Sequence, residues 1–323
     1  MMNNLLIKVL LLSFSSSIIA LIIFAIKPFV KFTLSKTWMY YIWLAVILRL
    51  LIPYSPKNNI MRSLYNFIES NNQILSVSSN ASIDSNVGSY IGIAWLSIAA
   101  VLIIKKVISY QVYTRYIKAN RKEIDNENIV RIFSEVCKEM RIENRIGLYS
   151  YKMINCPMLI GFLKPYIVLP ETMLNTTHDL RYILVHEITH HKRKDFLYKW
   201  LIQIILCVYF FNPVVYLIRD VVNKYCELSC DEMLISKLDK HGKKAYGSAL
   251  ISALEINSDL KQHTAVSLML CEDVKQIKER LDAILQYRQE ANIIIVYTFM
   301  LTCLICLCSV YIGVYAGGCC ICI

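Results

Sequence analysis

One short stretch of the sequence carries metal-ligating and acid–base side chains at a spacing that suits chemistry. His186 and His190 are four residues apart, and Glu187 directly follows the first of them, so the stretch reads His-Glu-x-x-His. Residues four apart on an α-helix lie on one face, where two imidazoles can bind the same metal ion. Glu187 would then stand where a carboxylate can act as a general base on water. The pattern is typical of zinc metalloproteases, although three fixed residues also occur by chance.

A catalytic zinc site needs a third protein ligand from elsewhere in the chain. Glu227 and Asp231 are also four residues apart and would share one helix face. Glu227 can ligate Zn²⁺, and Asp231 can accept the second N–H of a ligating histidine and so fix its tautomer. We therefore predict Zn²⁺ as the cofactor, with His186, His190 and Glu227 as ligands, Glu187 as the catalytic base and Asp231 behind the ligands.

The composition is that of a membrane protein. Hydrophobic residues make up 56% of the 323 residues, charged residues only 18%, and the mean hydropathy is +0.45. The net charge of +11 is explained by a Lys/Arg excess on the cytoplasmic side. Direct nucleic-acid binding is not expected, because no basic stripe with interleaved aromatic residues stands apart from the membrane flanks. Several of the twelve cysteines, Cys303, Cys306 and Cys308, lie inside an apolar run and would act as small hydrophobic residues, so structural disulfides are not expected either.

Apolar segments and their flanking charges predict the topology. We expect four transmembrane helices, at residues 9–26, 38–53, 90–104 and within 291–323. Lysine and arginine gather after the first and third segments and are sparse in the loop 54–89, which places the amino terminus and this loop outside. The predicted domains are residues 1–106 with three transmembrane helices, a cytoplasmic zinc metalloprotease domain at 107–290, and the fourth helix with a short tail at 291–323.

The uncharged run 200–218 would ordinarily be predicted as one more transmembrane helix. A single crossing would put Glu227 on the opposite side of the membrane from His186. Asn212 and Pro213 offer a break in the run, because proline interrupts a helix. We therefore predict a helical hairpin over residues 196–222 that abuts the membrane and returns, a prediction that partly presupposes a single active site.

Residues 156–170 contain two short β-prone runs punctuated by proline and glycine, which predict a small β-hairpin at a sheet edge. An edge strand beside a zinc site could hold a peptide by strand addition, and a purely structural hairpin is equally consistent. The alternating charges of residues 275–281 indicate a solvated helix face. The predicted fold class is a predominantly α-helical integral membrane protein with an α+β zinc protease domain.

With the His-Glu-x-x-His motif, the Phe-Asn-Pro break at 211–213 and the Cys-Glu-Leu-Ser-Cys-Asp-Glu segment at 226–232, the chain resembles the BlaR/MecR family of integral-membrane zinc metallopeptidases. The resemblance implies a multi-pass cell-membrane protein with a gluzincin-like domain, an active site in the cytoplasm and the site residues named above. Known members sense β-lactams outside and trigger cleavage of a transcriptional repressor. Nothing follows the fourth predicted span here, so a penicillin-binding sensor domain is expected to be missing and antibiotic sensing is not implied.

The expected function is a membrane zinc metalloendopeptidase that cleaves a cytoplasmic repressor or itself, in contact with membrane lipids and able to form a homodimer. One alternative is a housekeeping membrane-protein quality-control or CAAX-type metalloprotease, which would place two full spans between the two halves of the site. A second alternative is a non-enzymatic signalling scaffold, against which the intact His186, Glu187, His190 and Glu227 argue.

Overall fold

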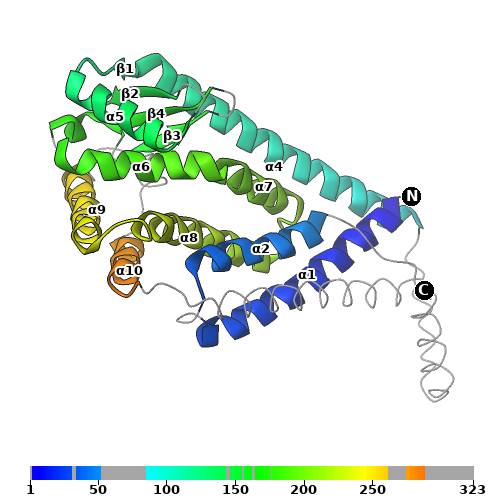
Figure 1. Ribbon diagram of the computed structural model, residues 1–323. Helices are drawn as coiled ribbons and strands as arrows, with labels where there is room; N and C mark the ends of the chain where they lie inside the picture. Colours follow the sequence, from blue (N-terminus) through cyan, green and yellow to red (C-terminus); the bar gives the residue numbers. More distant parts are fainter. Residues whose placement is uncertain are drawn as a thin grey trace.

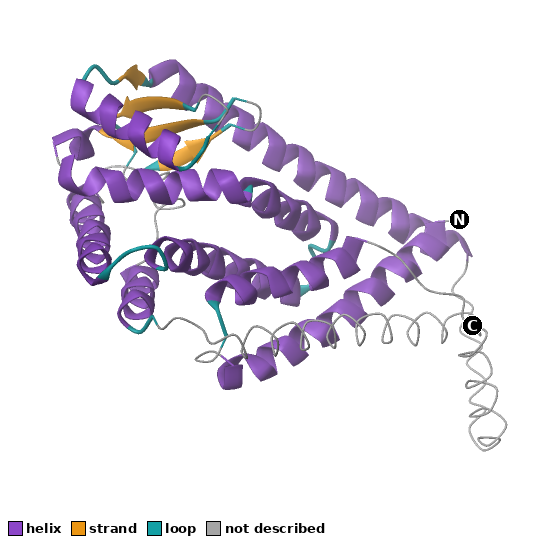
Figure 2. Ribbon diagram, in the orientation of Figure 1, coloured by secondary structure: helices purple, strands orange, loops and turns teal. Residues whose placement is uncertain are grey.

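The computed structural model describes residues 2–30, 34–51, 85–142, 146–154, 156–161, 164–175, 177–260 and 274–287. Most of these residues are helical, and one small sheet lies at one end of the molecule (Figure 2). The helices form layers beneath the sheet, and the sheet rests on the helix that carries the His-Glu-x-x-His motif (Figure 1).

The sheet has four strands in the order β1-β2-β4-β3: β1 Lys122–Glu123, β2 Gly147–Tyr151, β3 Met158–Ile160 and β4 Tyr166–Pro170. Strands β2 and β4 are parallel, and the other two pairs are antiparallel. One face packs against α5 (Glu127–Glu139) and α6 (Thr177–Arg193), and the other receives the end of α4 (Ser85–Asn120). A short 3₁₀ helix, η1 (Glu171–Asn175), leads from β4 into α6.

The predicted β-hairpin is present as β3 and β4, but the expectation that proline keeps both strands at an edge is wrong. Strand β4 lies inside the sheet, between β2 and β3, and all five of its residues are buried. Pro165 precedes the strand and Pro170 is its last residue, so neither removes an N–H from the middle of the ladder. In the part of the chain that the structure describes, β3 is the edge strand.

Helix α6 presents two faces with different tasks. Leu180, Leu184 and Ile188 recur every four residues, are at most 1% exposed and pack against the sheet. The histidines project from another face of the same helix. Lys194 then adopts a left-handed backbone conformation, with φ 58°, and this bend turns the chain into α7 (Asp195–Val208).

The apolar run 200–218 divides at the predicted place. Helix α7 ends at Val208, and α8 (Pro213–Ile235) begins with Pro213 in its first turn, where proline costs no hydrogen bond. The Asn212 side chain caps α8 by accepting from the Val214 N–H at 2.9 Å, and its amide nitrogen donates to the hydroxyls of Ser13 and Ser17 in α1 at 2.8 Å each. Helix α8 therefore returns toward α6, while contact of this hairpin with the membrane stays a prediction.

Among the described residues, two helices are long and apolar enough to cross a membrane: Lys8–Pro28 within α1 (Met2–Val30) and Gly88–Asn120 within α4. Helix α4 is longer than the predicted third span: it starts at Ser85, inside the predicted loop, and continues through Lys105 and Lys106. Which part of this helix crosses the membrane stays a prediction. The predicted second span forms α2 (Lys36–Leu51), a 16-residue helix packed between α1 and α8. The fourth predicted span and nearly all of the loop 54–89 lie outside the described residues.

Helices α9 (Lys240–Leu260) and α10 (Val274–Leu285) pack against the C-terminal part of α8. The prediction that residues 275–281 form a solvated face is wrong for Arg280, which is only 6% exposed. Arg280 lies three residues after Ile277 and four before Ile284, both buried, and so shares their face of α10. This helix therefore brings a buried cation toward α8.

Candidate metal centre

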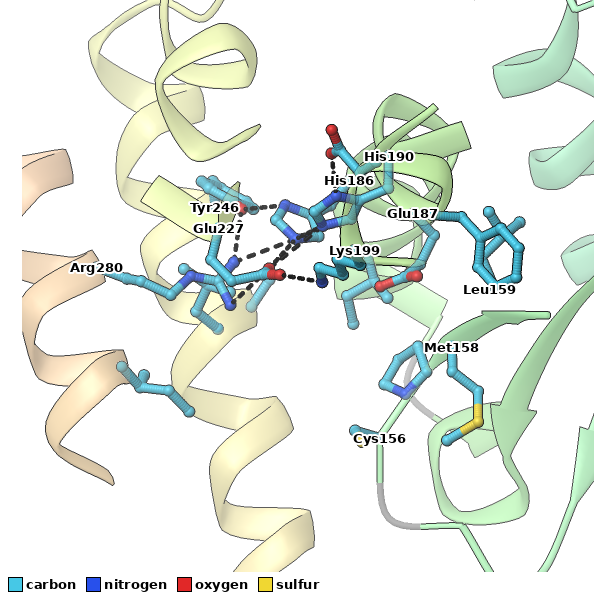
Figure 3. Close-up of a pocket in the computed structure, with 17 residues that line it drawn as sticks. Cys156, Met158, Leu159, His186, Glu187, His190, Lys199, Glu227, Tyr246 and Arg280 are labelled. Carbon is cyan, nitrogen blue, oxygen red and sulfur yellow. Dashed lines mark hydrogen bonds and ion pairs between the residues drawn. The ribbon is translucent and has the colours of Figure 1, made fainter. Parts of the chain in front are cut away.

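Three side-chain donor atoms from α6 and α8 meet at one point (Figure 3). The two Nε2 atoms of His186 and His190 are 3.1 Å apart, and the Glu227 Oε2 atom lies 3.3 and 3.2 Å from them. Ligands about 2.0–2.1 Å from a tetrahedral zinc ion are about 3.3–3.4 Å from each other. The three donors therefore fit three corners of a zinc tetrahedron, two of them occupied by histidine nitrogens and the third by a carboxylate oxygen.

The far nitrogen of each histidine has a partner that holds the ring. His190 Nδ1 lies 2.7 Å from Asp195 Oδ2. His186 Nδ1 lies 3.0 Å from the Tyr246 hydroxyl and 3.3 Å from Asp231 Oδ1. An ionised carboxylate only accepts, so Asp195 assigns the Nδ1 proton to His190 and leaves its Nε2 lone pair for a metal. Asp231 thus lies behind His186, at the nitrogen that does not face Glu227.

Asp231 belongs to a buried polar network around His186. Arg280 donates to both of its oxygens, from Nε and from Nη2, at 2.7 Å each, and Tyr246 donates its hydroxyl to Oδ1. Burial raises the pKa of Asp231, but the Arg280 charge and the hydrogen bond from His186 outweigh it and hold the pKa well below its usual range. Asp231 is therefore an ionised acceptor despite being 1% exposed.

Glu227 divides its two oxygens between different partners. Oε2 faces both histidines, while Lys199 of α7 donates to Oε1 at 3.2 Å. Burial raises the pKa of Glu227, but the charges of His190 and Lys199 lower it by more than burial raises it. The pKa of Glu227 therefore lies well below its ordinary value. Helix α8 thus supplies the carboxylate, and helix α7 supplies the cation that orients it.

Glu187 lines the cavity next to these donors. The cavity has a volume of about 290 Å³ and is walled on one side by the histidines and Glu227 and on the other by Met158 and Leu159 of β3 (Figure 3). Burial raises the pKa of Glu187, and the two histidines oppose this. A carboxyl group whose pKa lies above its usual range is a better base than an ordinary glutamate.

Cys230 offers a different third donor. With His186 and His190 it forms a group whose ligand atoms all lie within 4.8 Å of one another. Burial raises the pKa of the Cys230 thiol, but the two histidines lower it by more, so that this pKa is about 7. The thiol, however, lies 3.5 Å from the His186 carbonyl oxygen, to which it can donate, whereas Glu227 Oε2 is within 3.3 Å of both Nε2 atoms. The shorter distances favour Glu227.

A family model described as BlaR1 peptidase M56 matches residues 7–284. The chain belongs to this peptidase family. Among similar proteins, the chain is 28% identical over 176 residues to "Regulatory protein BlaR1" of Bacillus licheniformis, covering 53% of this chain and 29% of that protein. It is 29% identical over 157 residues to "Methicillin resistance mecR1 protein" of Staphylococcus aureus (strain Mu50 / ATCC 700699), covering 47% of this chain and 27% of that protein.

A longer match, 22% identical over 260 residues, joins the chain to "Regulatory protein BlaR1" of Staphylococcus aureus and covers 72% of this chain and 44% of that protein. The chain thus spans less than half the length of the relatives it matches. Membership in the M56 family supports a metallopeptidase, and two of these three relatives are named regulatory proteins.

In this member of the M56 family, all five predicted site residues lie together: His186, Glu187, His190, Glu227 and Asp231. Sequence reasoning missed four residues around them: Asp195, Lys199, Tyr246 and Arg280. A signal existed for Arg280, whose spacing from Ile277 and Ile284 marks a buried helix face. Tyr246 had none, because it reaches His186 from 60 residues away along the chain.

Proposed function

We propose that this chain is a zinc metalloendopeptidase that hydrolyses peptide bonds at the cytoplasmic face of the membrane. The observation that supports it is the set of mutual distances, 3.1–3.3 Å, among the donor atoms of His186, His190 and Glu227. These three residues would hold Zn²⁺. Asp231 would position His186, and Glu187 would stand beside the ligands as the catalytic base.

Zinc, when bound, supplies a Lewis acid that polarises the scissile carbonyl and acidifies water. Glu187 takes the proton of the attacking water and later delivers it to the leaving amine, as a general base and then a general acid. Asp195 and the Asp231–Tyr246 pair hold the two imidazoles so that each turns Nε2 toward Glu227. Lys199 keeps Glu227 ionised and fixes the direction of its carboxylate.

The substrate would bind along the free edge of strand β3. Met158 and Leu159 line the same cavity as Glu187, and β3 pairs on one side only, with β4, among the described residues. A peptide added there as a further strand would lie between β3 and α6, with a backbone carbonyl brought near Glu187. Such binding uses main-chain hydrogen bonds, so it suits an endopeptidase that cuts within an extended segment.

The biological role we propose is regulatory. Two of the relatives are named regulatory proteins, and the third is named for methicillin resistance, which favours a signalling peptidase over a housekeeping one. The substrate would be a cytoplasmic transcriptional repressor or the chain itself. The Lys/Arg bias supports the cytoplasmic placement of residues 107–290, and the hairpin 196–222 would abut the membrane from that side.

Replacing the proposed base tests the reaction. Glu187→Gln keeps the size of the side chain and removes its basicity, so turnover is expected to fall about 100- to 10,000-fold while zinc content stays at the wild-type level. Zinc is measured by elemental analysis of the purified full chain, and cleavage by hydrolysis of fluorescent casein and by self-cleavage. Glu135→Gln, an exposed surface substitution of the same kind, serves as the control. Full cleavage by Glu187→Gln would contradict the mechanism.

A further inference from the structure

Helix α2 reaches the metal centre although it precedes it by more than 100 positions in the sequence. Tyr40, in the second turn of α2, is fully buried, and its hydroxyl donates to Asp195 Oδ1 at 3.0 Å. The other oxygen of the same carboxylate lies 2.7 Å from His190 Nδ1. One carboxylate therefore joins a helix from the N-terminal part of the chain to a proposed zinc ligand.

The environment of Tyr40 fixes the direction of its hydroxyl. The ring meets Tyr198 of α7 edge-on, with centroids 4.9 Å apart and planes at 71°, and the Arg193 guanidinium lies 4.7 Å from the Tyr40 centroid. Arg193 also approaches Asp195, with 3.3 Å between Nε and Oδ1. These neighbours confine the phenol, so its hydroxyl restrains the rotation of the Asp195 carboxylate.

Helix α2 is fastened to the catalytic half of the molecule at a second point. Glu232, on α8 and five residues beyond Glu227, accepts from the backbone N–H groups of Lys36 and Thr37 at 2.9 and 2.8 Å. It also accepts from the Thr37 hydroxyl at 2.8 Å. A carboxylate at these first N–H groups caps the start of α2 and is favoured there by the helix dipole. The position of α2 along α8 is thereby set.

We propose that Tyr40 is a positioning residue of the metal centre, through which α2 orients His190 by way of Asp195. The proposal rests on the proposed function, because it assigns His190 to the metal. Without the Tyr40 hydroxyl, the Asp195 carboxylate loses one of its restraints and holds the imidazole less firmly. Partners behind a metal ligand typically change metal affinity by about 10- to 100-fold, and Tyr40 acts one step further out.

The test is zinc affinity, measured by competition with a chromophoric chelator on the full chain in detergent. Tyr40→Phe removes only the hydroxyl and is expected to weaken zinc binding about tenfold. Asp195→Asn is expected to weaken it about 10- to 100-fold. Tyr41→Phe removes a hydroxyl from the neighbouring, 44% exposed residue and is expected to bind as the wild type does. Adding Tyr40→Phe to Asp195→Asn is expected to cause no further loss, because both changes break one relay.

Wild-type affinity in a folded Tyr40→Phe chain would overturn the proposal, and so would a tenfold further loss in the double variant, which would indicate a packing effect. If Tyr40→Phe fails to fold, Asp195→Asn still decides: unchanged affinity there also overturns the relay. A wild-type chain that binds no zinc would refute the proposed function itself, an outcome distinct from a wild type that binds zinc with variants that match it.

Discussion

Glu227 and Cys230 are one helical turn apart on α8, and both face the histidines of α6. We expect Glu227→Gln to lower zinc affinity by more than about 100-fold, because even residues behind the ligands contribute 10- to 100-fold. Cys230→Ser is expected to leave affinity unchanged, since serine keeps a donor for the His186 carbonyl. Chelator competition on the purified chain measures both. The reverse order of effects would assign the third ligand to the cysteine.

For single residues, the sequence predicts those contacts that follow from spacing along one helix. His186, Glu187 and His190 are spaced by one helix turn, and so are Glu227 and Asp231, so the pattern alone makes them candidates. The residues that hold them do not follow from spacing. Asp195 reaches His190 only because Lys194 takes a left-handed conformation, and Tyr246 depends on how α9 packs against α6. Such contacts depend on tertiary packing rather than on periodicity.

Among the elements, the α7–α8 hairpin is held by the side chain at its turn. Asn212→Ser keeps an N-cap acceptor for α8 but loses the reach to Ser13 and Ser17, whereas Asn212→Ala loses both. We expect Asn212→Ala to destabilise the chain by about 1–3 kcal/mol and Asn212→Ser by less, with about 0.5–2 kcal/mol assigned to the cap itself. Thermal unfolding in detergent measures the difference. Equal stability of both variants and the wild type would show that the turn does not fasten α8 to α1.

The elements differ in how far sequence predicts them. The break at Asn212 and Pro213 can be predicted from the sequence, because proline interrupts a helix locally. Strand β4 is expected at an edge, yet it is central, because strand order depends on its parallel pairing with β2, and β3 separates these two strands in the sequence. The apolarity of helix α2 predicts a membrane span, and the structure shows that this helix also packs between α1 and α8. Whether it crosses the membrane stays a prediction. Hydropathy cannot separate a lipid neighbour from a protein one.

At the scale of the whole molecule, the candidate metal centre is predicted to lie on the cytoplasmic side of the membrane. A cysteine introduced at the exposed Val130 of α5 is expected to resist a membrane-impermeant maleimide in intact cells and to react after permeabilisation. Ser70→Cys, in the loop predicted to be outside, is expected to react in intact cells. The unmodified chain gives the background from native cysteines. Labelling of Val130→Cys in intact cells would place the centre on the outer side.

Helix α8 runs without interruption from its cap at Asn212, past Glu227, to Glu232. Each residue inserted or deleted within it would turn everything beyond by about 100° and shift it by about 1.5 Å. One such change between Asn212 and Glu227 would carry Glu227 away from the histidines and Glu232 away from the start of α2 together. The length of this segment is therefore as constrained as the identity of its acidic residues. Among related chains, an insertion here would mark a protein that has lost both its metal centre and the attachment of α2.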